Sequence, residues 1–452
     1  VADGSGRIQA ENLSADIDAS TLTGRLDVTT TSDASIKVLA GEANAYIDAA
    51  GSSANVNVDA ASMVSGTILY AFGSGDIVVD SVGTNLTVDA DGDTDNGHGV
   101  LTGTLDVNLA NNATSVTVRT GSEATNVSGD GGNAAINAKE LVIDTDLTLS
   151  GTSDYTVTEL VGDIVTSGAS GTLTVTTANA SDDRIDIETS AGETTINANQ
   201  SSDSIFVDAS DLADNTALNL NGSSVFDVSA LKGDLIADNG TGALDIALDD
   251  ASDINIQTAR TATVDASGMS VGNTLELGGT GDITVNSGDA DIDASGVGGA
   301  STLTGDLTVN TKEIDVDSNG VMTITTGSAS TTVDGQDADP ADTTTIDIVV
   351  DATAMADQLD GTVLNLGGNA EYRLVNDAAA NGDKVQVDLT NASNSGKLEL
   401  TGQGEYELIN TRADVDASIA EGPITVSTRD VPQDIITVTA GDSRLTVNAL
   451  DG

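Results

Sequence analysis

Residues 22–48 read LTGRLDVTTTSDASIKVLAGEANAYID. Three short segments of this stretch, Leu26–Val28, Ile36–Val38 and Tyr46–Asp48, mix apolar and polar residues at alternate positions and are separated by small and polar residues. Such alternation is typical of strands that bury one face, and a spacing of about ten residues is typical of short strands joined by turns. The pattern continues along the chain, and only 352–359 suggests helical turns. The sequence therefore predicts a nearly all-β fold.

Three phrases return along the chain, and such self-similarity is typical of solenoids and arrays. They are Leu-Thr-Gly at 22–24, 101–103 and 303–305; Gly-Asp-Ile at 75–77, 162–164 and 281–283; and an apolar residue followed by Asp-Ala-Ser at 17–20, 207–210, 264–267, 292–295 and 415–418. Several separations lie near multiples of 28 or 29 residues, as from Asp208 to Asp265 to Asp293. This period predicts coils of three strands each.

The predicted fold class is an elongated, parallel β-helix-like β-solenoid, in which small residues stack in rungs and Val, Ile and Leu fill a narrow interior. The alternative is a series of tandem antiparallel β-sandwich domains with a similar number of strands. Sandwich cores usually contain a large aromatic anchor, whereas this chain has 3 Phe, 5 Tyr and no Trp. The composition therefore favours the solenoid.

A change of composition near 334–342 predicts two regions, a repetitive β-solenoid at 1–342 and a C-terminal β module at 343–452. All 3 prolines lie at position 340 or beyond, and EYRLVN at 371–376 returns as EYELIN at 405–410. We expect the second region to contact a neighbouring subunit. The alternative is that it forms an irregular end of the same solenoid.

The charge of the chain restricts its partners. It has 15 Lys and Arg against 72 Asp and Glu, a formal net charge of -57. Such a field repels phosphate backbones and anionic membrane surfaces, so neither nucleic acid nor acidic lipid is an expected partner. The content of 38% hydrophobic residues in short β-branched runs argues against disorder. A compact state of this charge requires bound cations, and calcium is the leading candidate.

Calcium prefers six to eight oxygen ligands, which Asp-rich loops supply. Five clusters are therefore candidate calcium sites, and the densest alternates Asp over 89–95. The candidate ligands are Asp89, Asp91, Asp93, Asp95, Asp182, Asp183, Asp186, Asp245, Asp249, Asp250, Asp289, Asp291, Asp293, Asp334, Asp337, Asp339 and Asp342. The repeated calcium nonapeptide of β-rolls does not occur; its nearest match, GGTGDI at 278–283, is one residue short before its Asp.

Nothing in the sequence indicates a catalytic centre, so we predict that the protein is not an enzyme. The only histidine, His98, lies between glycines in NGHG and is expected to be a solvated loop residue. No nucleophile-elbow or phosphate-loop motif occurs, and the absence of Cys excludes a cysteine nucleophile and a thiolate zinc site. Paired carboxylates of a polysaccharide-active β-helix enzyme stay open as an alternative.

Export is expected from the composition. The chain has no Cys and few Lys, and it contains no apolar run long enough to span a membrane. We expect a mature, secreted chain, or a fragment of one, located at the cell surface without membrane insertion.

The phrases VDAS at 264–267, GDITVN at 281–286 and LTGDLTV at 303–309 resemble the strand repeats of Gram-negative surface-layer proteins and type I-secreted adhesins. This resemblance implies a chain that binds many calcium ions and assembles into a lattice held on lipopolysaccharide or another surface glycan. We therefore predict a structural protein that self-assembles with calcium into a surface layer. The alternative is an adhesin or biofilm-matrix stalk.

Overall fold

The structure is a computed structural model that describes residues 1–30, 35–50, 55–92, 97–166, 168–178, 184–198, 204–249, 253–270, 272–288, 290–296, 302–314, 321–337, 346–356, 362–378, 384–393, 397–429 and 435–449. The chain divides into two compact units, Val1–Asp227 and Val228–Gly452. Each unit is a parallel β-solenoid, and the two comprise about 18 turns. The predicted fold class is confirmed, and the sandwich alternative is wrong because the strands pair in parallel.

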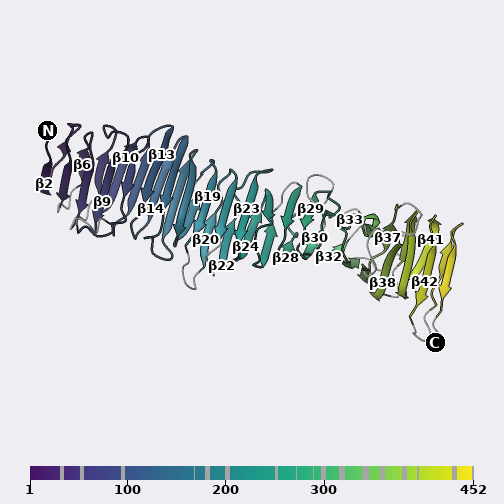
Figure 1. Cartoon of the computed structure of the whole chain (residues 1–452). Helices are drawn as coiled ribbons and strands as arrows, with labels where there is room; N and C mark the ends of the chain where they lie inside the picture. The colour runs from purple at the N-terminus through teal and green to yellow at the C-terminus, as the bar shows by residue number, and fades with distance from the viewer. Residues whose placement is uncertain are drawn as a thin grey trace. The chain divides into compact units, whose positions relative to one another are not determined.

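Each unit contains two sheets, and each coil contributes one strand to each sheet (Figure 1). In unit 1, sheet 1 consists of β2 (Ile8–Leu13), β5 (Leu26–Thr30), β7 (Ala45–Ala49), β9 (Ile68–Gly73), β11 (Thr87–Asp89), β13 (Ala113–Arg119), β15 (Gly132–Asn137), β17 (Asp154–Leu160), β19 (Leu173–Thr177), β21 (Thr194–Ala198) and β23 (Ala217–Gly222). Sheet 2 consists of β3 (Ile17–Asp18), β6 (Ile36–Leu39), β8 (Val56–Asp59), β10 (Ile77–Val82), β12 (Leu105–Leu109), β14 (Thr125–Gly129), β16 (Asp146–Gly151), β18 (Asp163–Thr166), β20 (Ile185–Glu188) and β22 (Ser204–Asp208). The short strands β1 (Asp3–Gly4) and β4 (Thr21–Leu22) form a separate pair.

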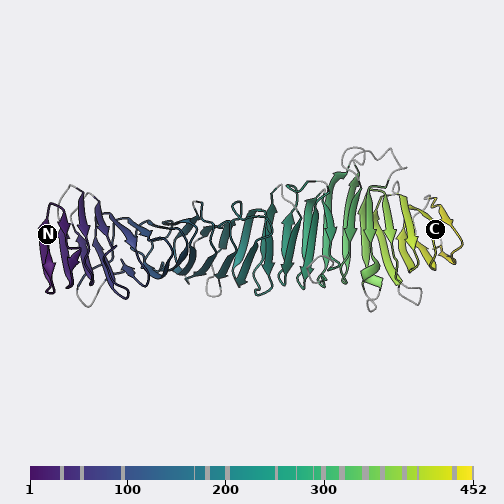
Figure 2. The same cartoon turned by 90° about the horizontal axis from the view of Figure 1, so that it is seen from above.

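Unit 2 repeats this arrangement, and its neighbouring strands lie side by side in Figure 2. Sheet 1 consists of β25 (Asp234–Ala237), β27 (Ile254–Thr258), β29 (Thr274–Gly279), β31 (Asp291–Asp293), β33 (Met322–Thr325), β35 (Ile348–Asp351), β37 (Tyr372–Val375), β39 (Lys397–Gly402), β41 (Asp414–Ala420) and β43 (Val438–Ala440). Sheet 2 consists of β26 (Leu244–Leu248), β28 (Ala262–Asp265), β30 (Ile283–Gly288), β32 (Leu307–Ile314), β34 (Thr331–Asp337), β36 (Leu364–Gly368), β38 (Lys384–Ala392), β40 (Glu405–Thr411), β42 (Ile424–Thr428) and β44 (Leu445–Asn448). β24 (Val225–Leu231) contains the division between the units, and the helix α2 (Thr353–Ala356) lies within the stretch where the sequence suggests helical turns.

The predicted coil of three strands with a fixed period is wrong, because a coil holds two strands of the sheets and coil length varies, reaching 28 residues between Ile77 and Leu105. In sheet 2, Ile36 pairs with Val56, and Val56 pairs with Ile77, so these coils repeat after 20 and 21 residues. Asp265 and Asp293, whose separation suggested the period of 28, lie in different sheets. The parallel pairing also continues from β33 to β35 and from β34 to β36, across the expected boundary at 342/343. A separate function for 343–452 stays a prediction.

The alternation of the sequence determines which side chains form the core. In β12, Leu105, Val107 and Leu109 are buried, whereas Asp106 and Asn108 point outward. Successive strands repeat this pattern in register, so that each inward side chain packs on its counterparts in the adjacent coils. Burying apolar area contributes about 25 cal/mol per Å² to folding. The interior is therefore stabilised mainly by rows of Leu, Val and Ile side chains.

The recurring phrases form the corners between strands. In each Asp-Ala-Ser phrase the Asp carboxylate accepts a hydrogen bond from the backbone N–H of the Ser, as between Ser267 N and Asp265 Oδ1 at 3.0 Å. In each Gly-Asp-Ile phrase the carboxylate instead accepts from the next coil, as between Asp306 N and Asp282 Oδ1 at 3.0 Å. The first kind of hydrogen bond stabilises a turn, and the second joins neighbouring coils.

The echo of EYRLVN in EYELIN marks another kind of corner. The hydroxyl of Tyr372 donates to the carbonyl of Gly367 at 2.7 Å, and that of Tyr406 donates to the carbonyl of Thr401 at 2.7 Å. Both side chains are buried, and each follows a glycine with positive φ by four residues, Gly368 and Gly402. Tyr372 lies in sheet 1 and Tyr406 in sheet 2, so one corner design serves both sheets.

Two glycines of one coil test how closely neighbouring coils approach. Gly272 and Gly279 have φ of 87° and 105°. A Cβ at Gly279 would lie 2.1 Å from the carbonyl oxygen of Thr258, whereas a Cβ at Gly272 would have nothing within 4 Å. The left-handed backbone alone costs an alanine about 1–2 kcal/mol, and overpacking adds about 1–3 kcal/mol.

We therefore expect Gly272→Ala to lower the free energy of unfolding by about 1 kcal/mol, the cost of its φ. Gly279→Ala should lower it by about 3 kcal/mol, since the clash adds to the same cost. Urea denaturation followed by circular dichroism measures both variants. Equal losses would contradict the close approach of the coils at Gly279.

Candidate functional site

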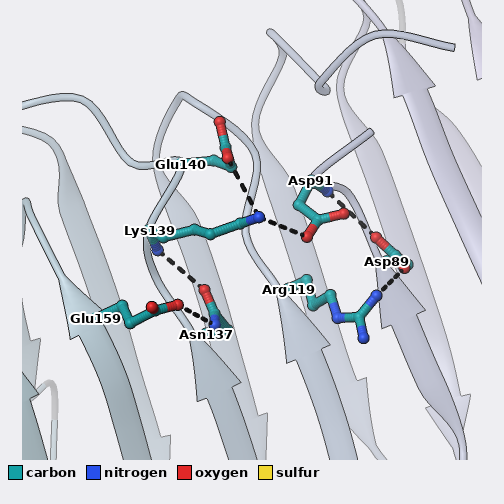
Figure 3. Close-up of polar contacts among 7 residues, drawn as sticks. All are labelled: Asp89, Asp91, Arg119, Asn137, Lys139, Glu140 and Glu159. Carbon is teal, nitrogen blue, oxygen red and sulfur yellow. Dashed lines mark hydrogen bonds and ion pairs between the residues drawn. The ribbon is translucent and has the colours of Figure 1, made fainter. Parts of the chain in front are cut away.

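The densest predicted calcium cluster begins at the end of β11, on the outward face of sheet 1 in unit 1 (Figure 3). Asp89 is 3% exposed, and Arg119 of the next coil donates from its guanidinium Nη1 to Asp89 Oδ2 at 2.6 Å. The register dictates this contact, because Asp89 in β11 pairs with Arg119 in β13. Asp91 lies beside Asp89, and its backbone N–H donates to Asp89 Oδ1 at 3.3 Å. Asp93 and Asp95 lie outside the described residues.

A second cation completes this network. The ammonium Nζ of Lys139 lies 3.3 Å from Asp91 Oδ2 and 3.5 Å from Glu140 Oε1. The contact with Asp91 raises the pKa of Lys139, so the ammonium is held in its charged form. Figure 3 shows Lys139 extended toward Asp91 from the corner after β15. The structure thus brings Asp89 and Asp91 together, but it pairs them with cations of the protein itself.

Burial has a further effect on Asp89. It raises the pKa of this carboxyl to about 6, and Asp91 adds to the shift through its hydrogen bond and negative charge, against the opposing effect of Arg119. The folded state therefore retains a proton at a pH where the unfolded chain, with an ordinary pKa of 3.8, has lost it. Stability from this group falls as the pH rises from about 4 to about 6.

A different arrangement occurs on the outward face of sheet 2 in unit 1, where carboxylates of successive coils line up. Asp146 pairs with Asp163 in register, Ile164 pairs with Ile187, and Glu188 pairs with Asp208. We call the five side chains Asp146, Asp163, Asp186, Glu188 and Asp208 the acidic row. Together with Ile164, Val165, Ile187 and Phe206 they line a shallow groove of about 240 Å³.

Several members of the acidic row already accept hydrogen bonds. Asp163 Oδ1 accepts from the backbone N–H of Asp186 at 2.8 Å, and Glu188 Oε2 accepts from that of Thr166 at 2.9 Å. Arg184 donates from Nη2 to Asp186 at 2.9 Å, and its guanidinium lies 4.3 Å above the ring of Phe206. Burial, and then the negative charge of nearby carboxylates such as Asp186, raise the pKa of Asp163, because both disfavour its charged form. Of the predicted residues, Asp186 belongs to this row, whereas Asp182 and Asp183 lie outside the described residues.

The other predicted ligands are dispersed over unit 2. Asp245 is exposed on β26, and Asp249 lies 4.0 Å from the ammonium of Lys232. Asp291 accepts from the backbone N–H of Thr323 at 2.7 Å, and Asp293 from that of Ser295 at 2.9 Å. Asp334 accepts from the amide of Gln336 at 3.1 Å. Asp250, Asp289, Asp339, Asp342 and the side chain of Asp337 lie outside the described residues.

Within the described part of the chain, no group of three or more His, Asp or Glu side chains is arranged to hold a metal ion. Asp291 and Asp293 serve the backbone of their own corners and of the next coil. Calcium binding therefore stays a prediction, and at these described positions it would need ligands beyond those of one coil.

Sequence reasoning missed an aromatic cluster on the outward face of sheet 1 in unit 1. Tyr46 and Tyr70 are paired in register and stack with ring centroids 4.3 Å apart. Phe72 stacks on His98 at 4.4 Å with an interplanar angle of 8°, and the guanidinium of Arg25 lies 3.5 Å above Tyr46. His98 is therefore a docked residue, and the expectation of a solvated loop side chain is wrong. The available signal was a Tyr at the outward position of two consecutive strands of this sheet.

Comparison with known proteins adds no relationship, since no family model, curated protein or solved structure matches this chain. In the residues that the structure describes, no helix is long and apolar enough to cross a membrane. The fold defines the chain as a parallel β-solenoid protein. The resemblance to surface-layer proteins stays a prediction.

The raised pKa of Asp89 can be tested by substitution. We expect Asp89→Asn to raise the melting temperature at pH 7, because the variant removes a buried negative charge and keeps an acceptor for Arg119. The fall in stability between about pH 4 and about pH 6 should become smaller. Thermal unfolding followed by circular dichroism at a series of pH values measures this change.

Asp416→Asn is the matched control. The hydroxyl and backbone N–H of Ser418 lower the pKa of Asp416, so this carboxylate contributes stability above its ordinary pKa of 3.8 that is lost on acidification. Its substitution should therefore lower the melting temperature at pH 7. If both variants shift it in the same direction, the role assigned to the burial of Asp89 is wrong.

Proposed function

We propose that this chain is a structural cell-surface protein that self-assembles with calcium into a surface layer. The observation that supports it best is the acidic row, in which Asp146, Asp163 and Asp186 follow one another in register on successive coils. Adjacent strands lie about 4.8 Å apart, so their carboxylates repel one another unless cations lie between them. Among the described residues of this row, only Asp186 has an ion pair with the protein itself.

Calcium is the proposed counter-ion because it accepts six to eight oxygen ligands with flexible geometry. An acidic row of one copy offers carboxylates along one line, and a second copy facing it would complete the coordination shell. In this proposal each calcium ion offsets charge on both copies and so permits contact between chains of net charge -57. The partner is therefore the chain itself, and the lattice forms only where calcium is present.

The proposal includes the remaining expectations about the environment of the protein. It places the chain outside the cell, at the cell surface, without a catalytic role. Lipopolysaccharide or another surface glycan is the proposed anchor. The charge of the chain supports the exclusion of nucleic acid, since phosphate contacts depend on Lys and Arg.

We expect electron microscopy to show ordered sheets or tubes in millimolar calcium and dispersed particles after chelation with EGTA. The triple variant Asp146→Asn, Asp163→Asn, Asp186→Asn should need about tenfold more calcium for assembly, because the number of charged ligands sets calcium affinity. Light scattering during a calcium titration measures the difference, and circular dichroism of the same samples confirms that the fold is retained.

A control triple variant, Asp18→Asn, Asp265→Asn, Asp416→Asn, changes the net charge equally but affects corner residues that accept bonds from Ser. It should assemble at nearly the wild-type calcium concentration. Monomers that are indifferent to calcium would contradict the proposal and favour an adhesin or matrix stalk. Assembly by magnesium at the same concentration would show that general screening, and not calcium coordination, brings the copies together.

A further inference from the structure

One corner of unit 1 is enlarged at the position where the aromatic cluster lies. Several corners are closed by a hydrogen bond from an apolar residue to an Ala three positions earlier, as between Leu22 N and Ala19 O at 2.8 Å. A hydrogen bond of the same kind joins Leu101 N to Ala90 O at 3.0 Å, but ten residues lie between these two, whereas two lie between Ala19 and Leu22. Excursions from a fixed scaffold are where solenoid proteins commonly place binding groups. The described end of this excursion, 97–100, returns over β9 through the contact of His98 with Phe72.

This return creates a groove of about 370 Å³ on the outward face of sheet 1. Its polar and aromatic side chains are Asp48, Phe72, Ser74, His98 and Thr102, and Ala50, Val100 and glycine backbone complete it. Asp48 Oδ1 accepts from the backbone N–H of Ala50 at 2.9 Å, which fixes the carboxylate beside the rings. Phe72 is paired in register with Asp48 and is 2% exposed beneath His98. The groove thus combines one carboxylate, two hydroxyls and the stacked rings.

The chemistry of this groove favours a cation with an apolar body. Ring faces attract cations, and a carboxylate nearby adds a direct counter-charge. The aromatic cluster beside the groove already holds a cation, since the guanidinium of Arg25 lies 3.5 Å above the ring of Tyr46 and also pairs with the carboxylate of Asp27. The field of a chain with net charge -57 concentrates cations and repels anions. Neither phosphate nor a carboxylate ligand fits this field.

We propose that the groove between Asp48 and His98 binds an alkylammonium ion, such as a choline-like group or the side chain of a lysine. The carboxylate of Asp48 faces the charge, the imidazole of His98 packs against the alkyl groups, and Ser74 and Thr102 offer oxygen acceptors. This site is separate from the acidic row and does not depend on assembly into a layer.

The test uses the full chain and two probes of the same shape, choline and its neutral isostere 3,3-dimethylbutan-1-ol. Saturation-transfer NMR and calorimetry should show choline binding with a Kd of about 1 mM, as expected for a partly exposed site of this kind. The neutral isostere should bind at least about tenfold more weakly. Nα-acetyl-lysine amide, measured in parallel, distinguishes a peptide source of the ammonium from a free or headgroup source.

Variants locate the site. Asp48→Asn and His98→Ala should each weaken choline binding by about tenfold, since each removes one of the two recognising groups. Asp80→Asn is the matched control, because Asp80 is an outward carboxylate of sheet 2 in the same unit that accepts from Asn108 at 2.7 Å. It should leave binding unchanged, and melting temperatures of all three variants establish that they fold.

Two outcomes would overturn the proposal. Equal binding of choline and the neutral isostere would assign the groove to neutral ligands such as saccharides. Equal weakening by Asp48→Asn and Asp80→Asn would mean that choline responds only to the net charge of the chain.

Discussion

Parallel stacking in register is the constraint on which the rest of this structure depends. Each outward side chain lies directly beside its counterparts in the coils before and after it, at the strand spacing of about 4.8 Å. Whatever the sequence places at one outward position is therefore repeated along a row. Tyr46 beside Tyr70 gives a ring stack, whereas Asp146 beside Asp163 gives accumulated negative charge. In a chain with 72 acidic residues, such repulsion between neighbouring carboxylates has to be offset at many positions.

The carboxylates fall into three groups, of which two are compensated within the chain. Corner residues such as Asp265 accept backbone hydrogen bonds, which hold the carboxylate against the turn. Others are paired with the few cations of the chain, as Asp89 is with Arg119. The acidic row has neither arrangement in full, and the pKa of Asp163 is raised by burial first and by repulsion from neighbouring carboxylates second. This residual charge is the physical reason to expect external cations at that face and not at every Asp-rich loop.

The sequence predicted the strands and the solenoid because alternation such as Ile36-Lys37-Val38 reports directly on which face is buried. It did not predict the period, because the repeated phrases mark corners, and similar corners occur after strands of both sheets. Asp265 and Asp293 share a phrase but follow strands of different sheets, so their separation is not a whole number of coils. The site was predicted less well, since the contacts of Asp89 with Arg119 and of Tyr46 with Tyr70 depend on a register that spacing alone does not reveal.

The same constraint explains why binding chemistry would concentrate at an enlarged corner. Within the ladder, an outward residue has to suit its neighbours on both sides, which restricts each row to groups that stack or pair. Residues 97–100 are free of that requirement, because Ala90 and Leu101 are joined by the ordinary corner hydrogen bond and these residues lie outside the strands of the ladder. The enlarged corner can therefore place a single His98 against Phe72 without repeating that residue in the next coil. A solenoid gains a local and unrepeated site most directly in this way, by extending one corner over a face that the ladder has already fixed.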